Sequence, residues 1–225
     1  MKSLPLLILV FAGLLLRDAS AQENSNIVHY PNRERSWERI PSVTIASKEN
    51  DQRIVLVMDA VDLWNRTFAE IGTPFRIGAV GRTSEILPVQ YLQSLSDAVL
   101  DRKALPQPPG ALSKIEGDLI VALSDGDFVS FSTGFLQGRR VIVGIKTDRL
   151  YPLTLPNVAR NVIAHELGHA IGLGHNNDPG KLMCGRPASC RPDAFRSSVE
   201  KYFPLTEVEK AYLLRIYPPT WAPSR

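Results

Sequence analysis

The chain has 225 residues and a formal net charge of +3, and 44% of its residues are hydrophobic and 22% are charged. This length is enough for one domain, or one domain with a tail, whose core can form without disulfides or a metal ion. The basic residues are spread along the sequence instead of forming a dense run interleaved with aromatic residues, which argues against nucleic-acid binding. We expect a monomer.

The N-terminus has the pattern of a secretory signal. Residues 1–2 give a short basic start, residues 4–16 are almost wholly apolar, and Ala-Ser-Ala at residues 19–21 fits a small-x-small cleavage site. The apolar run is shorter than the ~20 residues that a membrane-spanning helix needs. The sequence therefore predicts a signal peptide over residues 1–21 and a secreted protein, extracellular or periplasmic, without membrane contact after cleavage. An uncleaved membrane anchor is the alternative.

Strands and helices are predicted along most of the remaining chain. Residues 22–39 are polar and are expected to form an N-terminal arm, and residues 218–225 a proline-rich tail. Between them, short apolar runs indicate strands and apolar residues at helical spacing indicate helices. The predicted strands span residues 43–46, 75–80, 118–123 and 140–146, and the predicted helices span residues 51–70, 94–104, 156–173 and 206–216. This order predicts a sheet with helices packed on it, of the α/β or α+β class.

Individual residues in these helices have expected roles. Trp64 and Phe68 lie on the apolar face of the first helix and are expected in the core. Asn157 is expected to cap the third helix, which starts at a proline. Thr206 and Glu209, three residues apart, predict a capping box at the start of the last helix.

One segment carries the pattern H-E-x-x-H-x-x-G-x-x-H, from His165 to His175. Because His165 and His169 are four residues apart, a helix places both imidazoles on one face, where they can share a metal ion. Gly172 can take backbone angles that other residues resist, so the chain can leave the helix there and bring His175 round as a third ligand. Three of the four histidines of the chain fall at this spacing, which scattered core or surface histidines would not explain.

Three neutral imidazoles suit Zn²⁺ and leave a fourth position for water, as in catalytic zinc sites. Zinc lowers the pKa of its water from ~15.7 towards ~7 and can polarise a carbonyl oxygen. Glu166 lies beside the first ligand, where it would take the proton of that water and pass it to the leaving amine. The pattern thus predicts hydrolysis of a peptide bond with Glu166 as the catalytic base.

Cys184 and Cys190 are the only cysteines. In an exported protein, so close a pair indicates a disulfide that closes a small loop. Two free thiols, or thiols that bind a metal, are the alternatives, although two cysteines alone make a poor zinc site.

The segment from His165 resembles the metzincin metalloendopeptidases, and more closely their matrixin branch, the matrix metalloproteinases. The hallmark of this group is a methionine turn beneath the zinc, and Met183 follows His175 by eight residues, after an Asp-Pro-Gly loop at residues 178–180. The resemblance implies an α+β fold with a twisted mixed sheet, two long helices, one of them carrying the active site, and a small C-terminal subdomain with a final helix. It also implies a metalloprotease domain over residues 40–217.

The chain departs from the matrixin pattern in several ways. No histidine lies between His29 and His165, so the second, structural zinc of matrixins is expected to be absent. Both cysteines follow the motif, so the propeptide cysteine switch is missing. A Cys-Gly-Arg-Pro-Ala stretch replaces the usual Tyr-Pro after the turn methionine, so no substrate preference is carried over. Asp125 and Asp127 are either calcium ligands or part of a solvated turn. We expect a minimal, bacterial member.

In the resembled family the substrate peptide lies extended along an edge strand of the sheet. We take residues 140–146 as this edge, with an interior position as the alternative. The predicted function is that of a secreted zinc metalloendopeptidase acting on proteins or peptides. The alternatives are an exported binding protein of the same fold without turnover, which Glu166 argues against, and a zinc amidase acting on cell-wall peptides.

Overall fold

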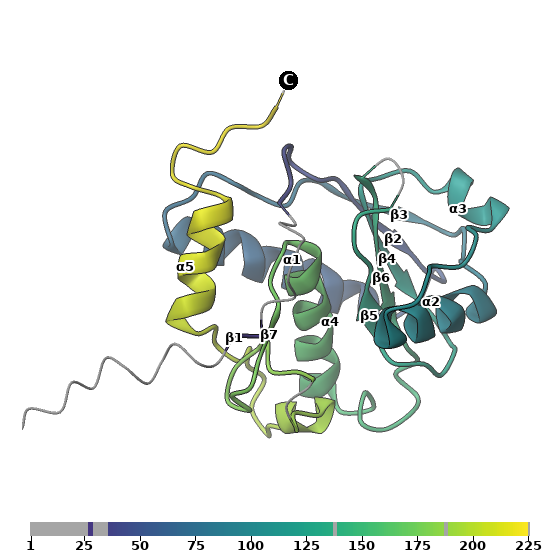
Figure 1. Ribbon diagram of the computed structural model, residues 1–225. Helices are drawn as coiled ribbons and strands as arrows, with labels where there is room; N and C mark the ends of the chain where they lie inside the picture. Colours follow the sequence, from purple (N-terminus) through teal and green to yellow (C-terminus); the bar gives the residue numbers. More distant parts are fainter. Residues whose placement is uncertain (1–26, 29–35, 137–138, 187–188, 225) are drawn as a thin grey trace, which may run out of the picture.

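A five-stranded sheet lies at the centre of the structure (Figure 1). This computed structural model describes residues 27–28, 36–136, 139–186 and 189–224. The strands follow the order β3-β2-β4-β6-β5, with β2 parallel to β3 and β4, β4 parallel to β6, and β5 antiparallel to β6. They span Val80–Thr83 (β3), Val43–Ala46 (β2), Leu119–Leu123 (β4), Val141–Ile145 (β6) and Phe131–Ser132 (β5). The mixed, mostly parallel sheet with its helices confirms the predicted fold class.

Helices cover both faces of the sheet (Figure 1). Alternate residues of a strand point to opposite faces, so Leu119 and Val121 pack towards α1 (Arg53–Glu70) and α4 (Pro156–Ala170), while Ile120 packs towards α2 (Val89–Asp101). On that second face lies also α3 (Gly110–Lys114), whereas α5 (Glu207–Ile216) packs into the same core cluster as α1 and α4. Burial on both faces explains why the central strands read as continuous apolar runs.

The two long helices α1 and α4 pack directly on each other. Trp64 and Phe68 of α1 are buried in the core, as predicted, and the Trp64 indole Nε1 donates to the Ala164 carbonyl of α4 at 3.0 Å. At the C-terminal end of α4, Trp37 Nε1 donates to the Ala170 carbonyl at 2.9 Å and the Tyr217 hydroxyl donates to the Ile171 carbonyl at 3.0 Å. These aromatic donors hold the end of the helix that carries the histidine motif.

Several predicted boundaries are wrong, and local contacts explain why. The strand expected over residues 75–80 appears only as β3, since Ile77 exchanges both backbone hydrogen bonds with the Asn65 side chain and regular pairing begins at Val80. The helix expected over residues 94–104 is α2, which starts directly after Pro88 and ends where Arg102 takes a left-handed conformation with φ 56°.

Two other predictions for the helices have opposite outcomes. Asn157 does not cap α4: Leu155 is the N-cap residue, and the buried Asn157 amide bonds instead to the Phe195 carbonyl and the Lys201 amide, both at 2.8 Å. The capping box of α5 is confirmed. Glu209 donates its backbone N–H to Thr206 Oγ1 at 3.1 Å, and its carboxylate accepts from the Thr206 amide at 2.7 Å.

The sheet edge beside the histidine motif is β5, not β6. β6 lies between β4 and β5, so the prediction of residues 140–146 as the edge is wrong and its interior alternative holds. β5 has only two residues, Phe131 and Ser132, which pair with Gly144 and Val143. A Cβ atom on Gly144 would come within 2.4 Å of the Phe131 ring, so the glycine leaves room for this short edge strand.

The structure describes only part of the segments predicted at the two chain termini. The predicted signal peptide, residues 1–21, lies outside the described residues, as does most of the arm over residues 22–39. Within that arm, β1 (Ile27–Val28) pairs antiparallel with β7 (His175–Asn176). In the described part of the chain, no helix combines the length and the apolar character needed to cross a bilayer.

Candidate metal centre

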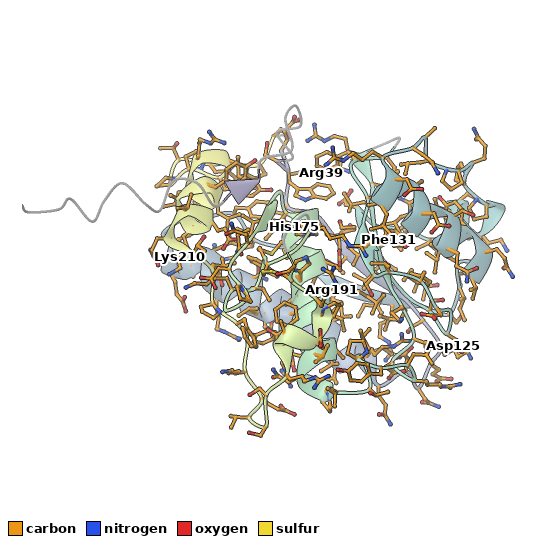
Figure 2. The ribbon with its side chains drawn as sticks, turned by 60° about the horizontal axis from the view of Figure 1, so that its bottom comes forward. Arg39, Asp125, Phe131, His175, Arg191 and Lys210 are labelled. Carbon is orange, nitrogen blue, oxygen red and sulfur yellow. A yellow bond between two sulfur atoms is a disulfide. The ribbon has the colours of Figure 1, made fainter. Side chains whose placement is uncertain are left out.

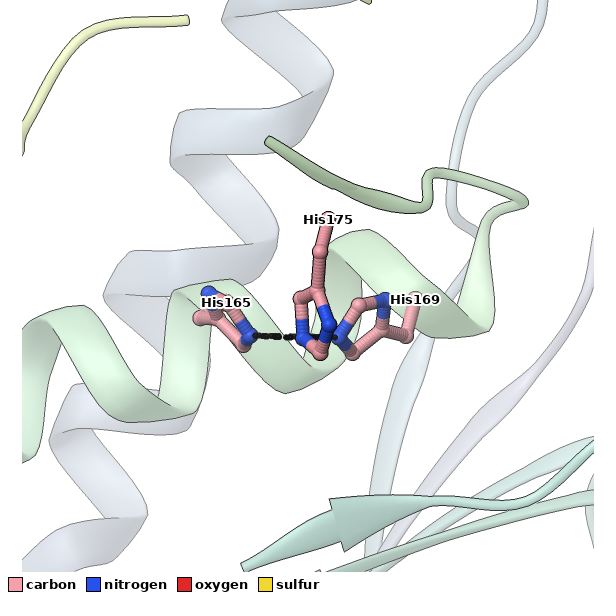
Figure 3. Close-up of side chains that lie close together, drawn as sticks. All are labelled: His165, His169 and His175. Atoms are coloured by element: carbon pink, nitrogen blue, oxygen red, sulfur yellow. Dashed lines mark hydrogen bonds between the residues drawn. The ribbon is translucent and has the colours of Figure 1, made fainter. Parts of the chain in front are cut away.

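Helix α4 and the turn that ends it bring the three motif histidines together (Figure 3). His165 and His169 project from one face of α4. Gly172 follows with a φ of 112°, and the amides of Gly172 and Leu173 donate to the carbonyls of His169 and Gly168 at 3.1 and 3.0 Å. This is a Schellman ending, in which glycine takes the left-handed position. The chain then turns back and presents His175 at the start of β7, as the sequence predicts.

The Nε2 atoms of the three histidines converge on one point. Their separations are 3.1 Å between His165 and His169, 2.9 Å between His169 and His175, and 3.2 Å between His165 and His175. Nitrogen ligands of a tetrahedral zinc ion, with Zn–N bonds of ~2.0–2.1 Å, lie about 3.3–3.4 Å apart. In the described part of the chain, these three side chains form the one group of potential metal ligands within reach of each other.

The other ring nitrogens fix the tautomer of each neutral histidine in the cluster. Each Nδ1 faces a backbone carbonyl: His165 faces Leu182 at 2.7 Å, and His169 faces Leu173 at 2.8 Å. His175 faces the Arg186 carbonyl, also at 2.8 Å. A carbonyl oxygen can only accept, so each Nδ1 donates a proton and each neutral ring directs its Nε2 lone pair at the other two. Three mutually facing lone pairs fit a cation, and the outer carbonyls are the usual partners of metal-binding histidines.

Burial favours the neutral form of these rings. It lowers the pKa of His165 to about 3, with the neighbouring His175 adding to the effect. Burial is also the main cause that lowers the pKa of His175. Because protons compete with metal ions for imidazole nitrogens, rings that stay neutral in acid are suited to binding a metal.

Glu166 lies beside the cluster and is buried, and it lines the same cavity as the three histidines. Burial raises the pKa of its carboxyl group to about 8. A carboxyl group with a pKa in this range can both accept and release a proton near neutral pH.

Met183 lies beneath α4, in contact with Gly168. A Cβ atom on Gly168 would come within 2.5 Å of Met183 Sδ and 2.9 Å of the Trp64 ring, so only glycine lets the buried methionine approach the helix so closely. The residue after Met183 is Cys184, which forms the predicted disulfide with Cys190.

Two residues near His175, Gly185 and Asn176, were missed by the sequence analysis, and a third, Glu209, was found for another role. Gly185 lies against the His175 ring: a Cβ atom there would come within 2.4 Å of Nε2 and 2.2 Å of Cδ2. The buried Asn176 donates to the buried Glu209 carboxylate at 2.6 Å, which joins the strand of the third histidine to α5. Glycine and asparagine are common in loops for many reasons, so only the folded contacts single out these two. Glu209 was found for its capping role alone.

A cavity of about 1080 Å³ opens over the cluster. Its walls come from the segment around β5, helix α4, and the disulfide loop with the 3₁₀ helix Pro192–Phe195, and also from the end of α2 with the residues that follow it and from α5. The histidines and the edge strand β5 therefore line the same cavity.

The calcium alternative gains no support from the structure. Asp125 forms an ion pair with Lys48, and Asp127 with Lys146, and both carboxylates lie outside the group of three histidines. Both carboxylates are thus neutralised by lysines, as in a solvated turn.

The chain is similar to solved structures of other proteins. Archaemetzincin from Methanopyrus kandleri is similar to this chain with a TM-score of 0.45 and 21% sequence identity, covering 80% of this chain and 96% of that chain. No family model and no curated protein matches the sequence.

Proposed function

We propose that the chain is a zinc metalloendopeptidase of the metzincin type, with His165, His169 and His175 as zinc ligands and Glu166 as catalytic base. One observation carries the proposal: three neutral imidazoles, each held at Nδ1 by a carbonyl, aim their Nε2 atoms at one point with separations of 2.9–3.2 Å. Such an arrangement of ligands, with Glu166 in the same cavity, is typical of catalytic zinc sites.

The mechanism divides between the metal and the carboxyl group. His165, His169 and His175 would hold the zinc, which would supply Lewis acidity that makes water more acidic and polarises the carbonyl of the scissile bond. Glu166 accepts a proton from the attacking water on its carboxylate and delivers it to the leaving amine nitrogen. Because burial raises the pKa of Glu166 to about 8, the carboxyl group can hold that proton between the two transfers.

The substrate would bind along β5. Residues of this edge segment, among them Phe131 and Ser132, line the cavity opposite the histidines. An extended peptide can pair with the free side of an edge strand through backbone hydrogen bonds, which selects peptides without demanding a sequence. This placement replaces the predicted edge over residues 140–146.

The branch and the location belong to the same proposal. Met183 beneath α4 at Gly168 and the motif spacing support a metzincin, of the matrixin branch. The Cys184–Cys190 disulfide is typical of proteins in oxidising compartments. Together with the predicted signal over residues 1–21, it supports a secreted enzyme, extracellular or periplasmic.

The test uses protein that starts at residue 22, its Glu166→Gln variant and the surface control Glu207→Gln. Each is incubated with casein and with a peptide library, with and without a chelator. We expect cleavage by wild type and by Glu207→Gln, a loss of about 10²-fold or more in Glu166→Gln, and no cleavage with chelator. Cleavage that survives either change would overturn the mechanism. Zinc binding without hydrolysis of any peptide would favour the exported binding protein, and activity on cell-wall peptides alone would favour the amidase.

A further inference from the structure

The cavity wall next to His175 carries two arginines. The Cys184–Cys190 disulfide closes a loop, and Arg186 inside it and Arg191 directly after it both line the cavity with exposed side chains. Figure 2 shows Arg191 in the neighbourhood of His175, with Phe131 on the sheet side. The two arginines are therefore positioned where a substrate bound over the cluster would meet them.

The backbone anchors both arginines close to the site. The Arg186 carbonyl accepts from His175 Nδ1 at 2.8 Å, and the Arg191 guanidinium donates to the Cys190 carbonyl at 2.8 Å. Within the described ranges of the chain, neither guanidinium forms an ion pair with a carboxylate, in contrast to Arg139 and Arg160 elsewhere on the surface. Both guanidinium groups can therefore bind a carboxylate of a substrate.

The residues that line the cavity also include more basic than acidic side chains. Its basic residues are Arg102, Lys103, Lys146, Arg186 and Arg191, and its acidic residues are Glu166 and Glu209; of the basic residues, Lys103 and Lys146 form ion pairs with aspartates outside the lining. The Glu209 carboxylate is buried and already accepts from Asn176 and Thr206, and Glu166 faces the histidines' cavity from α4. A cleft lined by one sign of charge focuses the field and attracts the opposite sign. Guanidinium groups bind carboxylates with two parallel hydrogen bonds.

We propose that this peptidase prefers substrates with Asp or Glu next to the scissile bond, on the side occupied by the disulfide loop, where Arg186 and Arg191 bind the carboxylate. This rests on the proposed peptidase function. The arginines act on substrate choice, whereas the histidines and Glu166 act on the bond that breaks.

The experiment measures a ratio within each protein, so that general loss of activity does not affect it. Zinc-loaded wild type, Arg186→Gln/Arg191→Gln and the control Arg66→Gln are given matched peptides that differ only as Asp or Asn, and Glu or Gln, on either side of the cleaved bond. Arg66 lies exposed on α1, outside the cavity lining. For wild type and the control, we expect kcat/KM to be about tenfold higher for the acidic peptide, and this preference to shrink as salt is raised.

In the double variant the ratio should fall to about 1, and in Arg191→Glu the preference should move from acidic towards lysine-containing peptides. Wild type that cleaves Asp and Asn peptides equally would overturn this inference and leave the peptidase function standing. A preference unchanged in the double variant would overturn the role of the arginines. Failure to hydrolyse any peptide would overturn the proposed function and this inference together.

Discussion

Among single residues, Gly185 lies against the ring of the proposed ligand His175 and leaves no room for a side chain. Its substitution by alanine would place Cβ within 2.4 Å of His175 Nε2, so the ring must move out of the cluster. We expect Gly185→Ala to weaken zinc binding about 10- to 100-fold, the range seen when groups that orient a ligand are changed. Gly110→Ala is the matched control, since a Cβ atom there meets nothing within 4 Å. Competition with a chromogenic chelator measures both affinities, and equal values would contradict the contact.

The buried ionisable groups make the stability of the metal-free protein depend on pH. The pKa of His165 falls from 6.5 to about 3 on folding. Its contribution to the free energy of unfolding is therefore complete above pH 6.5 and is lost as pH falls towards 3. The pKa of Glu166 rises from 4.5 to about 8, so its contribution is complete below pH 4.5 and is lost as pH rises towards 8. Between pH 6.5 and 8, the contribution of His165 to the free energy of unfolding is therefore constant, whereas that of Glu166 still changes with pH.

Metal-free wild type should consequently lose about 2 kcal/mol of unfolding free energy between pH 6.5 and 8. Glu166→Gln cannot ionise and should lose much less. Urea unfolding in the presence of chelator measures both. Parallel pH profiles for the two proteins would show that Glu166 does not carry the raised pKa.

Among the elements, α5 and β7 are joined by a buried hydrogen bond, from Asn176 to Glu209 at 2.6 Å. Glu209→Gln removes the charge that accepts from Asn176 and from the Thr206 amide, and hydrogen bonds to charged groups contribute about 1.5–3 kcal/mol. We expect a loss of stability in that range by urea unfolding. Glu207→Gln, in the same helical turn but exposed, should change stability by less than about 0.5 kcal/mol. Similar losses in both variants would mean that the buried bond contributes little.

Elements whose signals are local were predicted well from the sequence. The periodicity of α1, the apolar runs of β4 and β6, and the Thr206–Glu209 cap each depend on residues a few positions apart. The order of strands depends on pairing between distant segments, so the sequence did not reveal that β5 forms the edge. Asn157 failed as a cap because its amide is taken by the segment that follows the disulfide loop, a contact about 40 residues away.

In the candidate metal centre, too, features that depend on local spacing were predicted and features that depend on distant contacts were not. The spacing of the motif predicted three converging histidines, because helix geometry and Gly172 determine their approach. The carbonyls that fix their tautomers come from the turns at Leu173, Leu182 and Arg186, whose backbone directions depend on the whole fold. No pattern of residue types encodes such contacts.

Across the whole molecule, the cavity depends on walls that are distant in sequence, and the disulfide holds one of them. Closing a loop between residues six positions apart should stabilise the folded state by about 2 kcal/mol through the entropy of the unfolded chain. Cys184→Ser/Cys190→Ser should therefore unfold at lower urea concentration, and wild type treated with reductant should match it. A variant as stable as oxidised wild type would contradict this contribution.

If His165, His169 and His175 form one zinc site, the zinc content of the purified protein after extended dialysis should depend on them. We predict one zinc per chain in wild type and in Glu166→Gln, and almost none in His165→Ala/His169→Ala, with near-native circular dichroism of the variant as a control. Wild type without zinc under conditions that reload it, or a double variant that retains one zinc per chain, would contradict the account.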